Sequence, residues 1–383
     1  MTTVRGIIIG AGIGGLSAAI AMQMRHIQVR VFEAATSLHS IGAGILLPPN
    51  AMTILDRYHL AQHVRDRGCS IESLVILDSA GTRISTTPAH YSNNGQMYHT
   101  TAIQRGALQQ ILLKALAPDT VVTKKHCVAV DTGIDGATAT FRDGTQGCGE
   151  FLVGADGLHS RVRESIFPGR PLRYSGQTCW RGVSHIALQH TWRRQLTEVW
   201  GAGLRFGFVP IAEAQVYWYA TKQAAAGGRD DPSTIQQQMC DLYGEFVDPI
   251  GDILVHTNPS SIIRDDLSDL APLPSWFANS VVLMGDAAHA TTPNLGQGGA
   301  QAIEDSWVLA ETLAMCDTVQ KAFARFQASR IAKVQKIVKV SWHIGQATNL
   351  SNTMACTLRN TLLRCVPPWI AKHQARSLYE VSY

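Results

Sequence analysis

Three turns in this sequence place glycines and acids where a chain can bind a phosphorylated nucleotide. The first follows a run of isoleucines and spaces its glycines as G-x-G-x-x-G, at Gly10, Gly12 and Gly15. Glycines at this spacing let the backbone approach a pyrophosphate at the N-terminus of a helix. Asp156 and Asp286 each follow another apolar run. We therefore expect both carboxylates at the same nucleotide-binding edge of a sheet.

The elements that position the first turn follow in order along the chain. Apolar residues without alternation, Ile7 to Ile9, predict a strand buried on both faces of a parallel sheet. Apolar residues then repeat at helical spacing from Leu16 to Met24, and residues 28–32 predict a second strand that ends at Glu33. A carboxylate there can accept from ribose hydroxyls. The stretch predicts a dinucleotide site; a tight turn that binds nothing is the alternative.

The second and third turns have the same strand–turn–helix order. Asp156 follows the short strand 151–153 and precedes a basic helix start, so it is also a candidate helix N-cap, and the two roles are compatible. Asp286 follows the strand 281–284, and the loop Gly296 to Gly299 opens a long helix. That helix N-terminus is suited to an anionic or carbonyl group. A simple strand–loop–helix joint is the alternative.

Two arginines stand in positions that favour ligand contact. Arg105 lies in the first turn of a helix predicted over 104–116, where a cation gains nothing from the helix dipole. A phosphate contact and a solvated surface arginine both remain open for it. Arg205 lies in the first strand of a predicted hairpin, LRFGFVP and QVYWYAT, on the face opposite two phenylalanines. We interpret Arg205 as a substrate or flavin contact; an edge-strand arginine facing water is the alternative.

Composition excludes several classes of protein. Of 383 residues 45% are apolar and 16% charged, which is typical of a soluble protein with two or three domains. A net charge of +4 is too small and dispersed to argue for nucleic acid. The eight cysteines are scattered without metal-ligand spacing. They predict buried thiols in a reducing cytoplasm and no metal site.

Taken together, the three turns carry a family resemblance. Three segments resemble the motifs of FAD-dependent aromatic hydroxylases, the single-component flavoprotein monooxygenases related to para-hydroxybenzoate hydroxylase. These segments are GAGIGG at 10–15, GADGLHSRVR at 154–163 and GDAAHATTPNLGQGGAQAIED at 285–305. Ala300 departs from the Asn of many members. The resemblance implies an α/β fold: a Rossmann-like FAD-binding domain, an interleaved antiparallel β-sheet substrate domain and C-terminal helices. The expected ranges are 1–70, 100–175 and 265–345 for the FAD-binding domain, 71–99 and 176–264 for the substrate domain, and 346–383 for the helical segment.

The resemblance also implies how FAD is bound, tightly and without a covalent bond. The ADP half would lie on the first turn and Glu33, the pyrophosphate near Arg105, and the ribityl chain on Asp286. Asp156 and Arg163 belong to a motif implicated in both FAD pyrophosphate and pyridine nucleotide binding. His289 would pack rather than transfer protons. The residues implied at the flavin ring are Gly42, Ala43, Gly44, Ile45, Gly298, Gly299 and Ala300.

Within the family, the FAD-dependent urate hydroxylases share a further pattern. The pattern is an arginine, four residues, a proline and then a tyrosine on the following strand. Arg205, Pro210 and Tyr217 match it. The resemblance implies that Arg205 bridges flavin and substrate and that Tyr217 contacts the substrate ring. Similar segments occur in other hydroxylases and in carotenoid epoxidases.

The implied activity is hydroxylation of a small aromatic or heteroaromatic substrate, urate-like or an aromatic acid. NADH or NADPH reduces FAD, O₂ gives the C4a-hydroperoxyflavin, and an electron-rich ring takes one oxygen. One alternative is an epoxidase or hydroxylase of a lipophilic substrate, isoprenoid or quinolone-type, with Leu358 to Ile370 docking to a membrane. The preferred interpretation of that segment is a helix packed on the FAD-binding domain, without membrane contact. A flavin-binding redox sensor is the alternative outside enzymology. A monomer or homodimer is expected.

Overall fold

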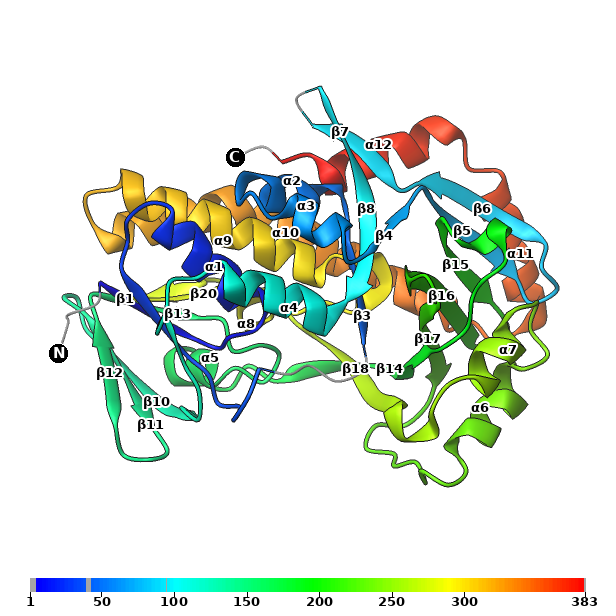
Figure 1. The fold of residues 1–383 in the computed structure, drawn as a ribbon, viewed down its shortest axis with the longest axis horizontal. Helices are drawn as coiled ribbons and strands as arrows, with labels where there is room; N and C mark the ends of the chain where they lie inside the picture. The colour runs from blue at the N-terminus through cyan, green and yellow to red at the C-terminus, as the bar shows by residue number, and fades with distance from the viewer. Residues whose placement is uncertain (1–4, 39–42, 94, 382–383) are drawn as a thin grey trace.

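The computed structural model describes residues 5–38, 43–93 and 95–381. Figure 1 shows two halves joined by long elements: one half contains a parallel sheet covered by helices, and the other contains an antiparallel sheet. This is the predicted α/β architecture with interleaved sheets and C-terminal helices. Gly42, expected along the flavin ring, lies outside the described residues.

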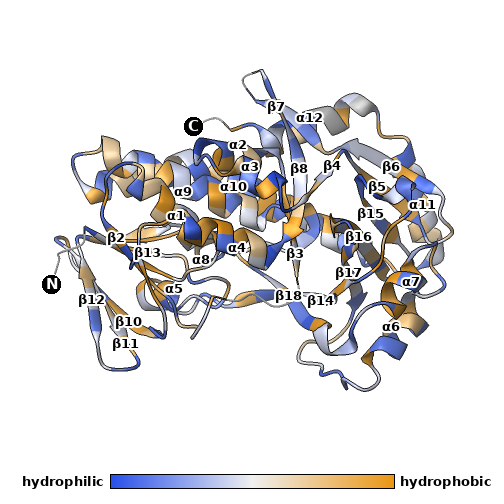
Figure 2. Cartoon of the chain, in the orientation of Figure 1, coloured by the Kyte–Doolittle hydropathy of each residue, from blue (hydrophilic) through white to orange (hydrophobic). Residues whose placement is uncertain are grey.

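The first half is built on a six-stranded sheet whose centre is fully buried. Ile9 pairs with both Phe32 and Gly154, and Gly154 pairs with Leu283, so the carboxyl ends of four strands meet at one edge, as predicted. Figure 2 shows these strands as hydrophobic, which suits a sheet covered on both faces. The strand order is β19 (Phe277–Ala278), β20 (Val281–Leu283), β13 (Phe151–Gly154), β1 (Gly6–Ile9), β2 (Val29–Phe32) and β9 (Val121–Val122).

Helices and a small sheet surround these strands. The residue pattern over 120–131 predicts a single strand, and this prediction is wrong. Strand β9 ends at Val122, and Lys124 adopts a φ of 61° before β10 enters another sheet. Lys125 N–H donates to the Glu33 carbonyl there, which turns the chain away. The helices are α1 (Ile13–Gln23), α4 (Arg105–Lys114), α5 (Arg161–Ile166), α8 (Asp286–His289), α9 (Gly298–Met315) and α10 (Val319–Thr348); the small sheet is β10 (Cys127–Thr132), β11 (Ala137–Phe141) and β12 (Gln146–Gly149).

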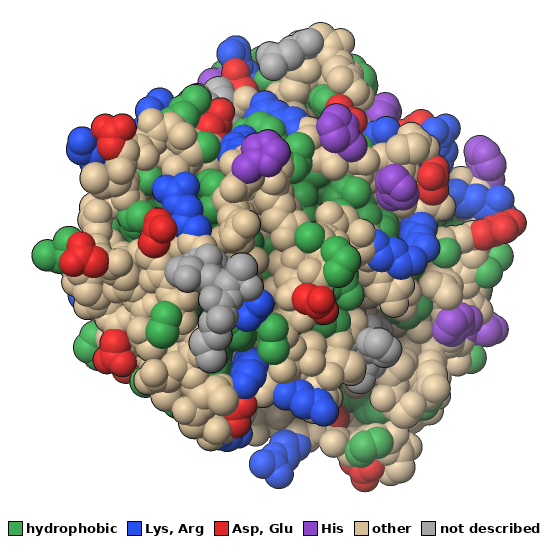
Figure 3. All heavy atoms as spheres, turned by 60° about the vertical axis from the view of Figure 1, so that its left-hand side comes forward, with side chains coloured by type: hydrophobic (Ala, Val, Ile, Leu, Met, Phe, Trp, Pro, Cys, Tyr) green, Lys and Arg blue, Asp and Glu red, His purple; other side chains and the backbone are tan. Residues whose placement is uncertain are grey.

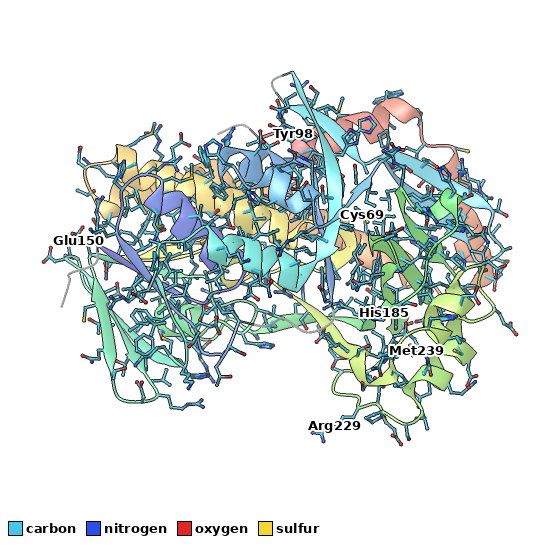
Figure 4. The ribbon with its side chains drawn as sticks, in the orientation of Figure 1. Cys69, Tyr98, Glu150, His185, Arg229 and Met239 are labelled. Carbon is cyan, nitrogen blue, oxygen red and sulfur yellow. The ribbon has the colours of Figure 1, made fainter. Side chains whose placement is uncertain are left out.

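A smaller antiparallel sheet lies between the halves. Tyr98, labelled in Figure 4, donates from β8 to Asp56 of α2 at 3.0 Å and so fixes this sheet to the first half. Its strands are β3 (Gly44–Leu47), β8 (Gln96–Gln104), β4 (Cys69–Ile71) and β7 (His90–Asn93), and the helices beside it are α2 (Pro49–Arg57) and α3 (Ala61–Arg65).

The second half is a seven-stranded sheet. Residues 71–78 and 82–87, joined by a Ser-Ala-Gly turn, predict a hairpin that forms as β5–β6. The predicted hairpin that contains Arg205 forms as β16–β17. Phe206 and Phe208 pack under helices α6 (Ile235–Tyr243) and α7 (Ile250–Val255), which were not predicted, while Arg205 lies on the other face. The strand order is β18 (Ile263–Leu270), β14 (Leu172–Ser184), β17 (Gln215–Gln223), β16 (Leu204–Ala212), β15 (Gln195–Trp200), β5 (Ser73–Asp78) and β6 (Arg83–Pro88), with 3₁₀ turns η1 (His190–Trp192), η2 (Pro259–Ser261) and η3 (Pro293–Leu295).

The C-terminal segment forms two helices, α11 (Thr353–Arg364) and α12 (Pro368–Tyr379). Helix α12 packs on α2, β7 and α10, whereas α11 packs on β6 of the seven-stranded sheet. The expected packing on the nucleotide-binding half therefore applies to α12 and not to α11. In the described ranges, no helix is both long and apolar enough to cross a membrane.

Candidate active site

The first glycine turn closes the carboxyl end of β1. Gly10 has a φ of 101°, and a Cβ on Gly15 would lie 1.9 Å from the Gly10 carbonyl oxygen, so both positions require glycine. A Cβ on Gly12 would meet no atom within 4 Å, so this glycine faces open space. Helix α1 begins there without a side-chain cap. Its first N–H groups are therefore available to an anion.

Glu33 is held beside this turn by backbone donors. Its carboxylate accepts from Ala11 N at 2.7 Å and from Ala35 N at 2.8 Å. On the same side, Gln109 of α4 donates to the Ala11 carbonyl at 2.9 Å. Glu33 thus lies at the end of β2 and next to the start of α1, the place predicted for a ribose contact.

Arg105 faces the same helix N-terminus across a small cavity. It lies in the first turn of α4, is exposed, and lines a cavity of about 210 Å³ with Gly12 and Ala43. Among the described residues, no carboxylate lies within ion-pair distance of its guanidinium. A free cation opposite an uncapped helix start favours the phosphate contact over the solvated surface residue.

Asp156 and Arg163 are used locally. Asp156 accepts from Arg161 N at 2.7 Å and Val162 N at 3.1 Å, the first N–H groups of α5. The N-cap residue of this helix is Ser160, whose hydroxyl accepts from Arg163 N, so the prediction of Asp156 at the N-cap position is wrong. Burial raises the pKa of its carboxyl. Arg163 is buried and donates to the carbonyls of Leu158 and Ala287 at 2.7 and 3.1 Å, which ties the second turn to the third. Neither side chain lines the two cavities, so their contact with a nucleotide stays a prediction.

The third turn opens onto a larger cavity of about 2420 Å³. Asp286 begins α8 with its carboxyl accessible from the cavity and protein on its other sides. Burial raises the pKa of this carboxyl, and His289 and Arg105 oppose the rise. A Cβ on Gly298 would lie 3.7 Å from Asp286 Oδ1, and one on Gly299 would lie 3.0 Å from the Ile45 side chain.

Helix α9 begins at this point without a side-chain cap, so its N–H groups face the cavity. Gly44, Gly298 and Gly299 line the same cavity, which unites most of the predicted ring-binding positions. Ala300 is buried behind them.

A buried ion network fixes the third turn. Asp305 accepts from Gly285 N at 3.0 Å, from His289 Nε2 at 2.6 Å and from Arg330 Nε at 2.8 Å. Burial pushes the pKa of Asp305 upward, but His289 and Arg330 outweigh it and lower the pKa to about 2. The His289 ring also packs on Trp276 with centroids 4.9 Å apart, so the histidine serves structure, as expected.

The wall of the cavity opposite α9 is the seven-stranded sheet. Arg205 is buried and donates from Nη2 to Asn294 Oδ1 at 2.7 Å, which joins the sheet to the loop before α9. Its Nε and Nη1 have no hydrogen-bond partner. Glu198 of β15 is also buried and accepts from Trp200 Nε1 at 2.8 Å and from the Tyr219 hydroxyl. A buried guanidinium with unpaired donors is costly unless a ligand pairs with it.

Tyr217 brings the sheet against the nucleotide-binding half. A Cβ on Gly44 would lie 2.4 Å from Tyr217 Cγ, so the ring packs directly over that glycine. Burial raises the pKa of the Tyr217 phenol, and Arg181 opposes the rise. The phenol therefore stays protonated at neutral pH. Arg205 and Tyr217 line one cavity.

Sequence reasoning missed four polar residues of this cavity. Glu198, Tyr219, Asn294 and Arg181 all line it beside Arg205. Glu198 had one detectable signal, a charged residue within the strand segment TEVW that is otherwise suited to burial. The others depend on strand register and loop placement, which the sequence pattern did not specify.

The geometry defines a flavoprotein in which a nucleotide-binding half presents its cofactor to a cavity walled by a β-sheet. Residues 2–341 match the family model described as FAD binding domain. The chain belongs to the FAD-dependent aromatic hydroxylase family of flavoprotein monooxygenases, which confirms the predicted family.

Two relatives match over nearly the whole chain. The aurachin C monooxygenase/isomerase of Stigmatella aurantiaca is 37% identical over 358 residues, covering 94% of this chain and 93% of the relative. The 2-heptyl-3-hydroxy-4(1H)-quinolone synthase of Pseudomonas aeruginosa is 34% identical over 365 residues, covering 94% of both. Klebsiella pneumoniae HpxO, solved with FAD and uric acid, shares the fold with a TM-score of 0.86, at 24% identity and covering 98% and 96% of the two chains.

The residues fit FAD. The features that would contact FAD follow the order of an ADP moiety, a ribityl chain and a flavin ring. They are the open side of Gly12, the uncapped starts of α1 and α9, and the carboxylates of Glu33 and Asp286. The larger cavity is several times the roughly 300–1,000 Å³ of a usual small-ligand site, which leaves room for a ring system besides a substrate.

Proposed function

We propose that this chain uses FAD, O₂ and NADH or NADPH to hydroxylate a heteroaromatic ring that bears an apolar side chain, a quinolone-type substrate. The observation that carries the proposal is the buried Arg205, with two unpaired nitrogens, next to the buried carboxylate of Glu198 in a largely apolar cavity. One of the relatives above 30% identity supports this substrate class, since it is named for a quinolone with a heptyl chain.

The polar end of the cavity matches the oxygen of such a ring. A 4(1H)-quinolone has a carbonyl and an N–H at opposite positions of one ring. Arg205 would donate to the oxygen, and Glu198, 3.8 Å from Arg205 Nη1, would balance the buried charge of the guanidinium. A guanidinium at the oxygen stabilises the deprotonated ring, whose negative charge is shared between this oxygen and the adjacent ring carbon, and this prepares that carbon for attack on an electrophilic oxygen.

The remaining residues position the ring and exclude water. Tyr217 packs over Gly44, so a substrate against its ring would lie next to the flavin position. Bound FAD, once reduced by the nicotinamide co-substrate, supplies activated oxygen: one atom enters the ring and the other leaves as water. Leu74, Ile76 and Leu196 line the same cavity and would accommodate the apolar side chain.

The alternative is a compact polar substrate such as urate or a small aromatic acid. Arg205 beside Asn294 and Tyr217 favours it, because these groups suit a planar anion, and HpxO with uric acid shares the fold. We also propose the domain ranges predicted from the sequence. The cysteines are free thiols throughout, which supports the proposed reducing cytoplasm.

The deciding experiment offers each substrate class to the FAD-loaded protein. NAD(P)H oxidation and product formation are measured with 2-alkyl-4(1H)-quinolones, urate and hydroxybenzoates. We expect coupled hydroxylation of an alkylquinolone alone. Coupled turnover of urate would instead establish the compact substrate, and flavin reduction without any product would point to a redox sensor.

A further inference from the structure

Helix α11 presents apolar side chains to solvent along one face. Met354, Leu358 and Leu362 follow one another at four-residue spacing and are 79%, 62% and 61% exposed. Residues four apart lie on the same face of a helix. Val366 follows the end of the helix and Trp369 lies at the start of α12, and they are 42% and 70% exposed. These five residues are called the outer ridge.

The opposite face of α11 is firmly fixed to the protein. Arg359 is buried, donates to the Ala347 carbonyl at 3.1 Å and lies 5.1 Å from the Trp200 ring centre. Arg364 donates to Asp78 at 3.0 Å. The orientation of the helix is therefore determined by specific contacts, and the outer ridge is exposed because the helix is held this way.

Helix α11 also forms part of the wall of the large cavity. Leu363, next to Leu362 of the ridge, lines the cavity from inside, and so do Arg364 and Val366. The helix thus separates the proposed substrate site from solvent with apolar residues on both of its sides. On the side of the C-terminal helices, the exposed residues that line the cavity are Ser329, Lys336, Val340, Arg364, Val366 and His373.

The charge of this part of the chain is of one sign. Lys336 and Lys339 are exposed, and within the described ranges neither has a carboxylate at ion-pair distance. On the face drawn in Figure 3, by contrast, cationic and acidic side chains are interspersed. Between residues 318 and 379 the sequence holds no Asp or Glu and ten cations. Five of them pair with carboxylates outside this range: Lys321, Arg330, Lys333, Arg364 and Arg376. The other five are Arg325, Lys336, Lys339, Arg359 and Lys372.

We propose that the outer ridge docks this protein on the surface of an anionic phospholipid bilayer, from which a lipophilic substrate enters the cavity past α11. Apolar side chains that enter the headgroup region, together with nearby cations, are what peripheral binding to anionic lipids requires. A tryptophan suits the interface. This proposal differs from the expectation, based on the sequence, that the protein makes no membrane contact. The pattern of residues 358–370 did not indicate which of their side chains would be exposed. The substrate route rests on the proposed function; the docking does not.

The test is flotation of the FAD-loaded full chain with vesicles of phosphatidylglycerol and phosphatidylcholine. We expect the protein to float with mixed vesicles and much less with pure phosphatidylcholine or at high salt. The double substitution Leu358→Asp and Leu362→Asp should lower the partition coefficient at least tenfold. The control, Ile134→Asp with Val255→Asp, changes two comparably exposed apolar residues on other faces and should float like the wild type.

Three results would overturn the docking proposal. The first is that the wild type does not float, and the second is that the Leu358 and Leu362 variant floats as well as the wild type. The third is that the wild type is a dimer, the variant is a monomer, and neither binds vesicles. The last would make the ridge an interface between copies. Turnover of a short-chain, water-soluble substrate should be unchanged in the variant. Because flotation needs no substrate, failure of hydroxylation by the wild type would reject the proposed function alone.

Discussion

Arg205 Nη1 and Glu198 Oε1 lie 3.8 Å apart on neighbouring strands, and both side chains are buried. This distance is too long for a hydrogen bond. Arg205 is held by Asn294 and Glu198 by Trp200 and Tyr219, so the two charges cannot simply close on each other. A substrate oxygen placed against the unpaired nitrogens of Arg205 would satisfy the arginine, while Glu198 balances its charge.

Replacing Arg205 should separate flavin reduction from hydroxylation. Arg205→Ala removes a charge-assisted hydrogen bond worth about 1.5–3 kcal/mol, so product per NAD(P)H consumed should fall at least tenfold. FAD content should be unchanged, because the arginine is not placed at the ADP half. Product and hydrogen peroxide are measured against NAD(P)H consumption. Arg229→Ala, on an exposed loop labelled in Figure 4, is the control. Normal coupling in Arg205→Ala would refute the role.

Replacing Glu198 should show whether it acts through Arg205. Glu198→Gln keeps the size and loses the charge that balances the buried guanidinium, so kcat/KM should fall about tenfold or more. The loss should be the same for a substrate with a ring N–H and for its N-methylated analogue, because Glu198 and Arg205 lie too close together to contact opposite ends of one ring. Glu213→Gln, at the exposed β16–β17 turn, should leave both rates unchanged. A loss confined to the N–H substrate would show that Glu198 accepts from this group instead.

Two alanine substitutions in the first turn should act differently. Gly12 has a φ of −71° and open space at its Cβ, so Gly12→Ala should leave the thermal unfolding of the apoprotein unchanged. It should weaken FAD binding at least tenfold, since the methyl group occupies the proposed pyrophosphate path. Gly15→Ala forces a contact at 1.9 Å and should lower the apoprotein Tm by several degrees. If FAD titration shows that Gly12→Ala binds FAD as tightly as the wild type, the pyrophosphate does not bind at the first turn.

The Asp305 network should contribute to stability in a pH-dependent way. The folded pKa of Asp305 is about 2, below the ordinary 3.8, so the folded state favours its ionised form. The stability from this ionisation is fully present above about pH 4 and is lost as the pH falls through about 2. Asp305→Asn breaks a buried pair and should cost about 3–5 kcal/mol at neutral pH.

Urea unfolding at pH 6 and pH 3 is the measurement for this network. The wild type should lose more stability between the two pH values than Asp305→Asn does. Asp317→Asn, whose side chain is 91% exposed, is the control and should follow the wild type. Parallel pH profiles for wild type and Asp305→Asn would show that another group controls acid unfolding.

The parts of the fold that sequence predicted are those encoded locally. The strand ends at Gly10, Asp156 and Asp286 follow from short apolar runs and glycines, and their convergence follows from the rule that parallel strands end at one edge. Arg205 was recognised because alternation placed it opposite two phenylalanines. Glu198 was missed because its contact with Arg205 depends on the pairing of β15 with β16, which no local pattern states.

Two further failures have the same cause. Strand 120–131 had the right propensity throughout, but backbone bonds from Lys124 and Lys125 to Ala35 and Glu33 divide it between two sheets. For α11, the sequence predicted a helix but not which face is covered. The contacts of Arg359 with Ala347 of α10 and with Trp200 of β15 decide that, and Trp200 is far away in the chain.

Strand β14 makes the two halves inseparable as engineering modules. Leu172 at its start is partly buried and packs against the core of the six-stranded sheet, and Trp180 further along packs in the core of the seven-stranded sheet, within one strand. A chimaera that exchanges the substrate-facing sheet between relatives should therefore place its junctions in loops outside Leu172–Ser184. A cut within β14 would leave each partner with an unpaired edge and half a core, and neither piece would be expected to fold alone.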